Sequence, residues 1–295
     1  MKILLTGANG FVAKRFVEMY ADKHEIIALG RTPVPGEAGE KVGFIACDLG
    51  SAAGLPDLIA SGGLPEKIDA VVHMAVSRGH RDFPETAIDL FQVNTAATIY
   101  LLDYARRAGA SNFILGSTCS VYDGVEERPV PENCNPTPTR FWPGTKYSAD
   151  MMAGFYKDFF ASCVIRYATP YGPGQTDRFL PAIINRVSND MAVSLPMDGD
   201  GIIIRPIYVD DAAELIDRAI RENWQGIVNG VGDEVLNLVQ TATRIGAIVG
   251  KTPNFERDPN AGAYDIVADN TELRRRLGDH ALTGFDEGLK RTIAG

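Results

Sequence analysis

The sequence predicts an α/β fold: a doubly wound parallel sheet with a smaller C-terminal region interleaved with it. In the first half of the 295 residues, short apolar runs alternate with helix-length amphipathic segments, which is the pattern of parallel βαβ units. Beyond Pro170, frequent Pro and Gly indicate short, loop-linked elements. The apolar run Ile227 to Val231 then returns to strand character, so the second region is expected to interleave with the first.

The expected strands are short, apolar and bounded by polar or glycine residues. They are Ile3 to Thr6, Glu25 to Leu29, Phe44 to Ala46, Ala70 to His73, Phe113 to Leu115 and Cys163 to Tyr167. Helices are expected where apolar residues recur at helical spacing. They are Phe11 to Ala21, Phe91 to Arg107 with Gly109 as its stop, and Lys146 to Phe160.

Composition excludes several classes of protein. The 29 Lys and Arg against 38 Asp and Glu give a net charge of −9, the opposite sign to that of a phosphate-backbone binder. Four widely spaced cysteines without a CxxC pair predict neither a disulfide framework nor a zinc site. The sequence has no signal-peptide pattern and no run of about 18 apolar residues. We therefore expect a cytoplasmic protein that binds neither nucleic acid, nor membrane, nor metal.

The turn after the first strand is rich in glycine and leads directly into the first helix. Gly7 permits a tight turn, Gly10 allows the backbone to approach a phosphate, and the small Ala13 allows the helix to pack closely. Free N–H groups at a helix N-terminus attract anions, so Gly7, Asn9, Gly10, Phe11 and Val12 are candidate cofactor contacts. The alternative is an ordinary strand-to-helix turn.

The end of the second strand bears on the choice of cofactor. A carboxylate there would accept the ribose hydroxyls of NAD, whereas an arginine would pair with the 2′-phosphate of NADP. The sequence reads Leu29-Gly30-Arg31-Thr32, without a carboxylate. Arg31 therefore favours NADP over NAD, although a surface arginine in a loop would look the same.

With these motifs the chain resembles the extended short-chain dehydrogenase/reductases, the NAD-dependent epimerase/dehydratase family, over nearly its whole length. The matching segments are Thr6 to Phe11, Cys47-Asp48-Leu49, His73 to Val76, Asn94-Thr95, Ser117 to Tyr122, Arg166-Tyr167, Tyr171 to Pro173, and Arg205 before Tyr208-Val209-Asp210-Asp211. The resemblance implies a Rossmann domain over residues 1–170, with 207–231 returning to it. It implies a substrate region over 171–206 and 232–295.

The same resemblance assigns roles around a dinucleotide. Asp48 would accept the adenine amino group, and Leu49 would pack on adenine. Further residues would line the dinucleotide: Met74, Ala75, Val76, Ser117, Lys146, Tyr167 and Pro170. Asn94 would kink or brace its helix near the site. Asp210 and Asp211 would be structural and would cap the helix that continues as Ala212 to Ile220.

The family's catalytic group is a Ser or Thr, a Tyr and a Lys, with the Tyr as general acid or base. Thr118 occupies the Ser/Thr position and Lys146 the Lys position, but Trp142 stands where the Tyr is expected. An indole has no titratable proton, and Tyr147 points about 100° away from Lys146 on a helix. Ordinary Tyr-based catalysis is therefore not expected.

Another acid is needed if the protein is active. The candidates near the expected site are Thr118, Cys119, Tyr122, Lys146 and a water molecule held by them. Burial and a neighbouring positive charge both favour a neutral lysine, so we expect a relay from Lys146 through water or through Thr118. For Cys119 and Cys134, thiols without a role are the simpler interpretation.

The residues at the expected substrate positions give divided evidence for a nucleotide-sugar. Thr169 stands where nucleotide-sugar members carry an Asn, but Arg205, which would suit a diphosphate, is present. Ser77, Arg78 and His80 stand where loops contact sugars in relatives, and a solvated loop histidine is an equal alternative for His80. Thr118 would orient a substrate hydroxyl. Dehydration is disfavoured, because Cys119 and Ser120 replace the family's Asp-Glu pair.

The sequence therefore predicts an NAD(P)-dependent oxidoreductase or epimerase that acts on a hydroxyl or keto carbon of a sugar-like, possibly nucleotide-sugar, substrate. The resemblance implies a homodimer through the two long helices. Two alternatives stay open: a catalytically impaired NAD(P)-binding sensor, or a reductase of a non-nucleotide small molecule.

Overall fold

The computed structural model describes residues 1–295 except 78, 80–81, 177, 263–264 and 266. The chain divides into two compact units, and the chain crosses between them several times. Unit 1 comprises Met1–Gly124, Asn135–Arg166 and Ala213–Val228, and unit 2 comprises Val125–Cys134, Tyr167–Ala212 and Asn229–Gly295. Residues 125–134 thus belong to unit 2, inside the range expected for the Rossmann domain.

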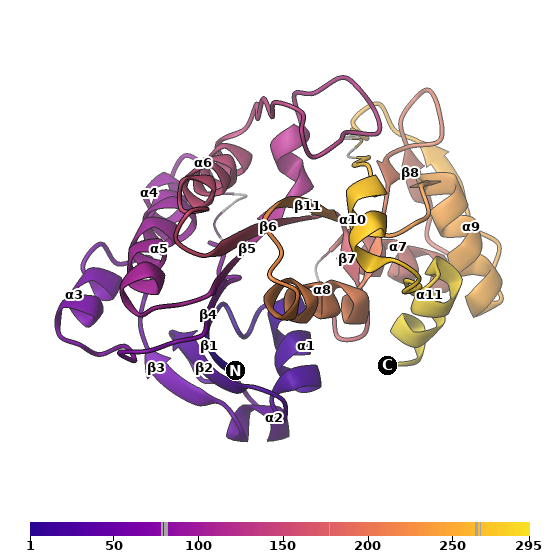
Figure 1. Cartoon of the computed structure of the whole chain (residues 1–295). Coiled ribbons are helices and arrows are strands. Elements are labelled where there is room, and N and C mark those ends of the chain that lie inside the picture. Colours follow the sequence, from indigo (N-terminus) through magenta and orange to yellow (C-terminus); the bar gives the residue numbers. More distant parts are fainter. Residues whose placement is uncertain (78, 80–81, 177, 263–264, 266) are drawn as a thin grey trace. The chain divides into compact units, whose positions relative to one another are not determined.

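A seven-stranded sheet in the order β11-β6-β5-β4-β1-β2-β3 dominates the fold (Figure 1). Its strands are β1 (Lys2–Thr6), β2 (Glu25–Gly30), β3 (Gly43–Ala46), β4 (Ala70–His73), β5 (Asn112–Thr118), β6 (Ala161–Tyr167) and β11 (Gly226–Gly230). The pairs β1–β2, β1–β4, β2–β3 and β4–β5 are parallel. The strand order reverses at β1, so the predicted doubly wound α/β sheet is confirmed.

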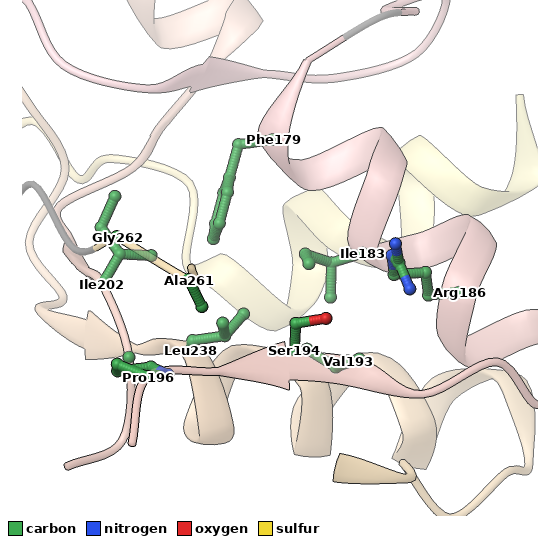
Figure 2. A pocket seen from close by; sticks show the side chains of 11 residues that line it. Phe179, Ile183, Arg186, Val193, Ser194, Pro196, Ile202, Leu238, Ala261 and Gly262 are labelled. Atoms are coloured by element: carbon green, nitrogen blue, oxygen red, sulfur yellow. The ribbon is translucent and has the colours of Figure 1, made fainter. Parts of the chain in front are cut away.

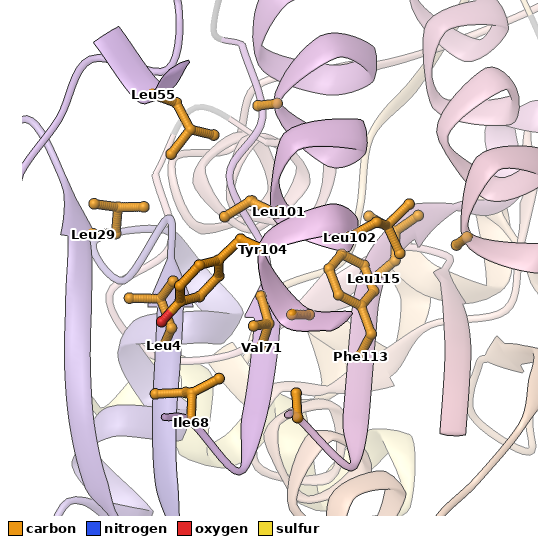
Figure 3. Packing of buried hydrophobic residues seen from close by; sticks show 14 of the residues in the cluster. Leu4, Leu29, Leu55, Ile68, Val71, Leu101, Leu102, Tyr104, Phe113 and Leu115 are labelled. Atoms are coloured by element: carbon orange, nitrogen blue, oxygen red, sulfur yellow. The ribbon is translucent and has the colours of Figure 1, made fainter. Parts of the chain in front are cut away.

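The helices of unit 1 follow the βαβ pattern. They are α1 (Phe11–Tyr20), α2 (Glu37–Glu40), α3 (Gly54–Ala60), α4 (Ala87–Phe91), α5 (Ala97–Arg107), the 3-10 helix Cys119–Tyr122 and α6 (Phe141–Phe155), with α8 (Val209–Arg221) crossing from unit 2. Buried side chains from the strands and from α3, α5 and α6 form an apolar core on one face of the sheet (Figure 3). Leu4, Val71 and Phe113 come from the sheet, and Leu101 and Leu102 come from α5.

Two helices differ from the predicted ranges. The helix expected at Lys146 to Phe160 is α6, which begins five residues earlier at Phe141 and ends at Phe155. Pro143 falls in its first turn, where a missing N–H breaks no helical hydrogen bond. The helix expected from Phe91 to Arg107 contains the π-helical turn Gln92–Ala96 before α5. Periodicity cannot reveal a one-residue insertion in a helical turn.

Unit 2 consists of short elements, as the Pro and Gly pattern predicts. They are β7 (Pro170–Tyr171), α7 (Phe179–Ser188), β8 (Val193–Leu195), β9 (Ile203–Ile204), β10 (Ile207–Tyr208), β12 (Leu236–Asn237), α9 (Leu238–Val249), β13 (Phe255–Arg257), α10 (Thr271–Leu277) and α11 (Phe285–Ala294). Asp211 lies in the first turn of α8, rather than before the helix, and accepts hydrogen bonds from Thr283. No helix of the described residues is long and apolar enough to cross a membrane.

Candidate active site

The predicted site residues fall into both units, and each group is described within its own unit. Unit 1 carries the glycine-rich turn, the residues after β2, β3 and β4, and the pair Thr118 and Lys146. Unit 2 carries Tyr167, Thr169, Pro170 and Arg205.

The glycine-rich turn has the backbone geometry that its sequence predicts. Gly7 has a φ of +70°, and a Cβ there would come within 2.5 Å of the main-chain nitrogen of Ala75. Gly10 is the N-cap of α1, with no side-chain cap and no acidic residue in the first turn of the helix. The N–H groups of that turn have no acceptor within the helix. This end of α1 therefore suits an anionic pyrophosphate.

The loop after β2 is held by the glycine-rich turn. The Asn9 amide donates hydrogen bonds to the main-chain oxygens of Thr32 and Pro33, at 3.0 and 3.2 Å. Asn9 thus supports the loop that presents Arg31. The Arg31 side chain is exposed and makes no hydrogen bond or ion pair with any residue that the structure describes.

The two residues predicted to contact adenine face different surroundings. Asp48 is exposed, and its carboxylate accepts a hydrogen bond from the Gly50 N–H at 3.0 Å. Leu49 is buried in the core cluster of unit 1. Asp48 is thus available to a ligand, whereas Leu49 already packs against the protein.

Two further predicted cofactor contacts follow the glycine-rich turn at the start of α1. Phe11 is half-buried and Val12 is buried.

The segment after β4 follows the edge of the sheet. Met74 and Ala75 are half-buried and Val76 is 46% exposed. Ser77 is buried, its hydroxyl donates to the Asp89 carboxylate, and its N–H donates to the Asn94 side chain at 3.3 Å. Ser77 therefore braces this loop. The expected sugar-contacting residues Arg78 and His80 lie outside the described residues.

Asn94 connects this loop to α6. It lies in the π-helical turn and is fully buried, and its amide donates to the Thr145 hydroxyl at 3.0 Å. The Thr95 hydroxyl donates to the Thr145 carbonyl at 3.0 Å. The first turn of α6, which contains Trp142 and Thr145, is therefore fixed by the distorted helix beside it.

Sequence reasoning missed Asp123, which fixes the segment before α6. Its carboxylate accepts hydrogen bonds from the Thr139 N–H at 2.7 Å and from Arg140 Nε at 2.8 Å. The side chain is only 1% exposed. Nothing in the local sequence pattern indicates this contact, because it joins residues 16 and 17 positions apart.

Thr118 is the last residue of β5, and Lys146 lies within α6. Thr118 accepts a hydrogen bond from the Ser120 N–H at 3.1 Å. Lys146 is 2% exposed, and its Nζ donates to the Gly116 carbonyl at 2.7 Å. Burial lowers the pKa of the Lys146 ammonium to about 8, although Asp150 opposes this change. Lys146 can therefore exchange a proton near neutral pH.

Neighbouring aromatic residues do not supply the absent tyrosine. Trp142 lies one turn before Lys146 on α6 and is half-buried. The Tyr147 hydroxyl reaches Asn135 at 3.4 Å. The Tyr122 hydroxyl, in contrast, accepts a hydrogen bond from Arg166 at 2.9 Å in the interior. Ser117 is buried beside Thr118.

A buried ion pair beside Lys146 was also missed from the sequence. Asp150 accepts a hydrogen bond from Arg166 Nε at 2.9 Å, and both side chains are 1% exposed. The sequence did carry a signal, because Asp150 follows Lys146 by four residues and so shares its helix face. The partner Arg166 on β6 could not be identified by spacing.

In unit 2, Tyr167 and Arg205 are both engaged with main-chain carbonyls. The Tyr167 hydroxyl donates to Ala212 at 2.9 Å. Arg205 donates from Nε to Gly232, from one terminal nitrogen to Ala268 and from the other to Asp233, at 2.9, 3.0 and 3.3 Å. A guanidinium has five N–H donors, so a phosphate at Arg205 would have to use those left over. Pro170 is half-buried in β7.

Thr169 has a strained backbone. Its φ is +44°, a left-handed conformation that is unfavourable for a β-branched residue. Asparagine tolerates this conformation better. We expect Thr169→Asn to raise the free energy of unfolding by about 0.5–1 kcal/mol in a urea titration. The control Thr169→Val keeps the β-branch and should give no gain; equal stability of the Asn and wild-type proteins would show that no strain is relieved there.

Unit 2 also contains a cavity of about 240 Å³ (Figure 2). Phe179 and Ile183 of α7, Leu238 of α9 and Pro196 after β8 contribute apolar walls, and Arg186 of α7 is the cationic side chain of the lining. The cavity could hold a flat, partly apolar group with an anionic or hydrogen-bonding edge.

Comparisons with known proteins agree with this geometry. The Haloferax volcanii low-salt glycan biosynthesis protein Agl12 is 26% identical over 311 residues, which cover 99% of this chain and 97% of that protein. A dTDP-glucose 4,6-dehydratase of Streptomyces antibioticus is 29% identical over 320 residues, which cover 99% of this chain and 91% of that protein.

Solved structures share the fold over the whole chain. UDP-glucose 4-epimerase of Thermotoga maritima, solved with UDP-glucose, has a TM-score of 0.83 and 22% identity, with 100% of this chain and 98% of that chain covered. MoeE5, solved with UDP-glucuronic acid and NAD, has a TM-score of 0.82 and 24% identity at the same coverage. The sequence profile of the family described as "NAD dependent epimerase/dehydratase family" matches residues 3–232, most of the chain. The chain belongs to the NAD-dependent epimerase/dehydratase family, whose members are enzymes.

Proposed function

We propose that this protein binds NAD and catalyses oxidation and reduction at a hydroxyl or keto carbon of a sugar nucleotide, as an epimerase or an oxidoreductase. The observation that carries the proposal is the buried Lys146, whose Nζ is hydrogen-bonded to Gly116 of β5 and whose pKa is lowered to about 8. The uncapped start of α1 follows β1 at the carboxyl ends of the same parallel strands. Relatives described as a UDP-glucuronate 4-epimerase and as dTDP-glucose 4,6-dehydratases support the substrate class. Membership of this family favours an enzyme over a sensor.

NAD is the cofactor that we propose. The uncapped N-terminus of α1 would hold its pyrophosphate, and the exposed carboxylate of Asp48 would accept a hydrogen bond from its adenine. NAD stands in the family's description and in the MoeE5 complex, whereas the preference for NADP that Arg31 predicted finds no support in the comparisons. When bound, NAD would supply hydride acceptance and donation.

The chain's own residues would manage the proton. Thr118, partly buried at the end of β5, would orient the substrate hydroxyl. Lys146 would take the proton from that hydroxyl through Thr118 or a water molecule, and would return it in the reverse step. Trp142 would limit the access of further solvent to them by its bulk, and its indole has no titratable proton to exchange. This relay does not need the absent tyrosine.

Within unit 2, the cavity is of a kind that would suit a nucleotide base. Its apolar walls suit a flat ring, and Arg186 would lie near polar groups of the ligand. Dehydration through an Asp-Glu pair is not proposed, because Cys119 and Ser120 take those positions and the Cys119 thiol donates to the Arg166 carbonyl at 3.1 Å.

The test begins with the full-length protein as purified. We expect mass spectrometry of the denatured protein to release NAD, and we expect UDP- or dTDP-hexoses to be converted to a 4-keto sugar or an epimer, detected by NMR. A non-nucleotide hydroxy-sugar of the same configuration is the control and should react at least about 100-fold more slowly, because the base contacts are lost. A protein that binds neither NAD nor NADP would overturn the proposal.

We also propose that the protein is a homodimer through α4, α5 and α6. Large apolar side chains are exposed on and beside these helices in unit 1: Ile88 at 72%, Phe155 at 73% and Phe159 at 61%. A solvent-exposed apolar surface of this kind is typical of an interface. A second copy of the same face would cover it through two-fold symmetry.

The expected effect of Phe155→Glu is dissociation. A buried carboxylate without a partner is costly at the centre of an apolar interface, so we expect the dimer dissociation constant to rise by about 100-fold or more. Sedimentation velocity measures this change. Lys290→Glu, a charge change on an exposed residue of α11 outside the proposed face, is the control. A wild-type protein that sediments as a monomer at high concentration would contradict the proposal.

A further inference from the structure

Three charged side chains lie together in the interior of unit 1. Lys146 and Asp150 are one helical turn apart on the buried face of α6. Arg166 reaches Asp150 from β6, with its Nε 2.9 Å from the carboxylate. Water is largely excluded from all three, since they are 2%, 4% and 1% exposed. Their charges therefore act on one another with little screening.

The charges of this cluster do not balance. Arg166 cannot lose its proton, so it needs the Asp150 carboxylate as its counter-charge. Lys146, whose Nζ donates to the Gly116 carbonyl, feels that same carboxylate from one helical turn away. The cluster carries one net positive charge when Lys146 is protonated and none when Lys146 is neutral. Burial favours the neutral cluster.

Other titratable groups around Lys146 add little charge. His73 of β4 is fully buried, and burial, together with the Lys146 charge, lowers its pKa to about 3, so it stays neutral. Tyr122 of the 3-10 helix faces Arg166, to which its hydroxyl is hydrogen-bonded at 2.9 Å. On β5, the Gly116 carbonyl accepts a hydrogen bond from Lys146 Nζ. Among the described residues, Asp150 is therefore the charge that acts directly on Lys146, and Arg166 is the charge paired with Asp150.

We propose that Asp150 and Arg166 are positioning residues that set the proton affinity of Lys146 in opposite directions. The Asp150 carboxylate holds the proton on Lys146. Arg166 weakens that hold, because it competes for the same carboxylate and adds a like charge. The inference rests on the proposed function, in which Lys146 takes and returns the substrate proton without a tyrosine.

The test is a pH titration of the full-length protein, labelled with 13C at the lysine ε-carbons and observed by NMR. Lys146→Arg assigns the signal. We expect Asp150→Asn to lower the pKa of Lys146 by about one pH unit or more and Arg166→Met to raise it by a similar amount. Tyr122→Phe, which changes no charge, is the matched control and should leave the titration nearly unchanged. Structural damage alone would move both charge variants in the same direction, and that result would overturn the proposal.

A wild-type measurement covers the case in which these variants do not fold. The 13Cγ signal of Asp150 should show an inflection at the pH where Lys146 titrates, because the carboxylate senses the loss of the neighbouring charge. An Asp150 signal that is flat through that pH would contradict the shared carboxylate.

These measurements need no turnover, so they are separate from the proposed function. Opposite shifts in a protein without activity on any sugar nucleotide would uphold the charge arrangement and overturn the function. Shifts of both variants in the same direction in an active enzyme would overturn the charge arrangement and uphold the function. In an active enzyme, the acidic limb of the pH dependence of kcat should also move with the pKa of Lys146, down in Asp150→Asn and up in Arg166→Met.

Discussion

Lys146→Met is expected to abolish turnover while making the protein more stable at neutral pH. Methionine has a similar length and fits an apolar site, but it carries no proton. Loss of the general acid and base should lower kcat by about 10³-fold, whereas NAD, held mainly by the start of α1, should still bind. Progress curves followed by NMR give kcat, and fluorescence titration gives the NAD affinity.

The gain in stability has a definite pH dependence. The pKa of Lys146 falls from 10.5 in the unfolded chain to about 8 in the fold, so the unfolded state binds more protons between these values. The contribution of Lys146 is fully present above about 10.5 and is lost as the pH falls through about 8. Wild type should therefore lose about 3 kcal/mol relative to Lys146→Met over that window. Urea titrations at several pH values measure this difference.

Lys157→Met is the control for the lysine substitution, because Lys157 is exposed after the end of α6. Urea titrations of this variant over the same pH range measure what the loss of an exposed lysine does to stability by itself. Unchanged turnover in Lys146→Met would exclude the relay. A stability difference that stays constant with pH would show instead that Lys146 keeps its ordinary proton affinity in the fold.

The sheet could be predicted from the sequence because its strands are buried and apolar. In the run Ala70 to His73 the first three residues are apolar, and β4 covers that range. The glycine-rich turn was also predictable, since a φ of +70° at Gly7 and its close approach to Ala75 both require glycine. Local physics determines each of these features.

The supports of the catalytic residues could not be predicted in the same way. Asp123 fixes Arg140, and Arg166 pairs with Asp150, through contacts between elements that only the folded chain brings together. The carbonyl partners of Arg205 are likewise 27 to 63 residues away in sequence. A motif identifies the residue type at a site, but its proton affinity and its free donors depend on such distant partners.

Trp142→Tyr should increase the rate of hydride transfer if the site is otherwise aligned. Trp142 lies four residues before Lys146 on α6, so a phenol there would share the helix face of the lysine. The first turn is held by the hydrogen bond from Thr145 to the Trp142 carbonyl at 2.7 Å, which uses the main chain and survives the substitution. A phenol beside a lysine can act as acid and base, so we expect a gain of about 10²-fold in single-turnover reduction of bound NAD.

Trp142→Phe separates the hydroxyl from the change in volume. Phe and Tyr leave the same space where the indole was, so both should lose similar stability, about 1–2 kcal/mol, and only Tyr should gain rate. Equal rates in the two variants would mean that the new hydroxyl does not take part in proton transfer to or from the substrate. A rate below wild type in both would mean that the indole itself limits solvent around the Lys146 relay, and that turnover depends on Trp142.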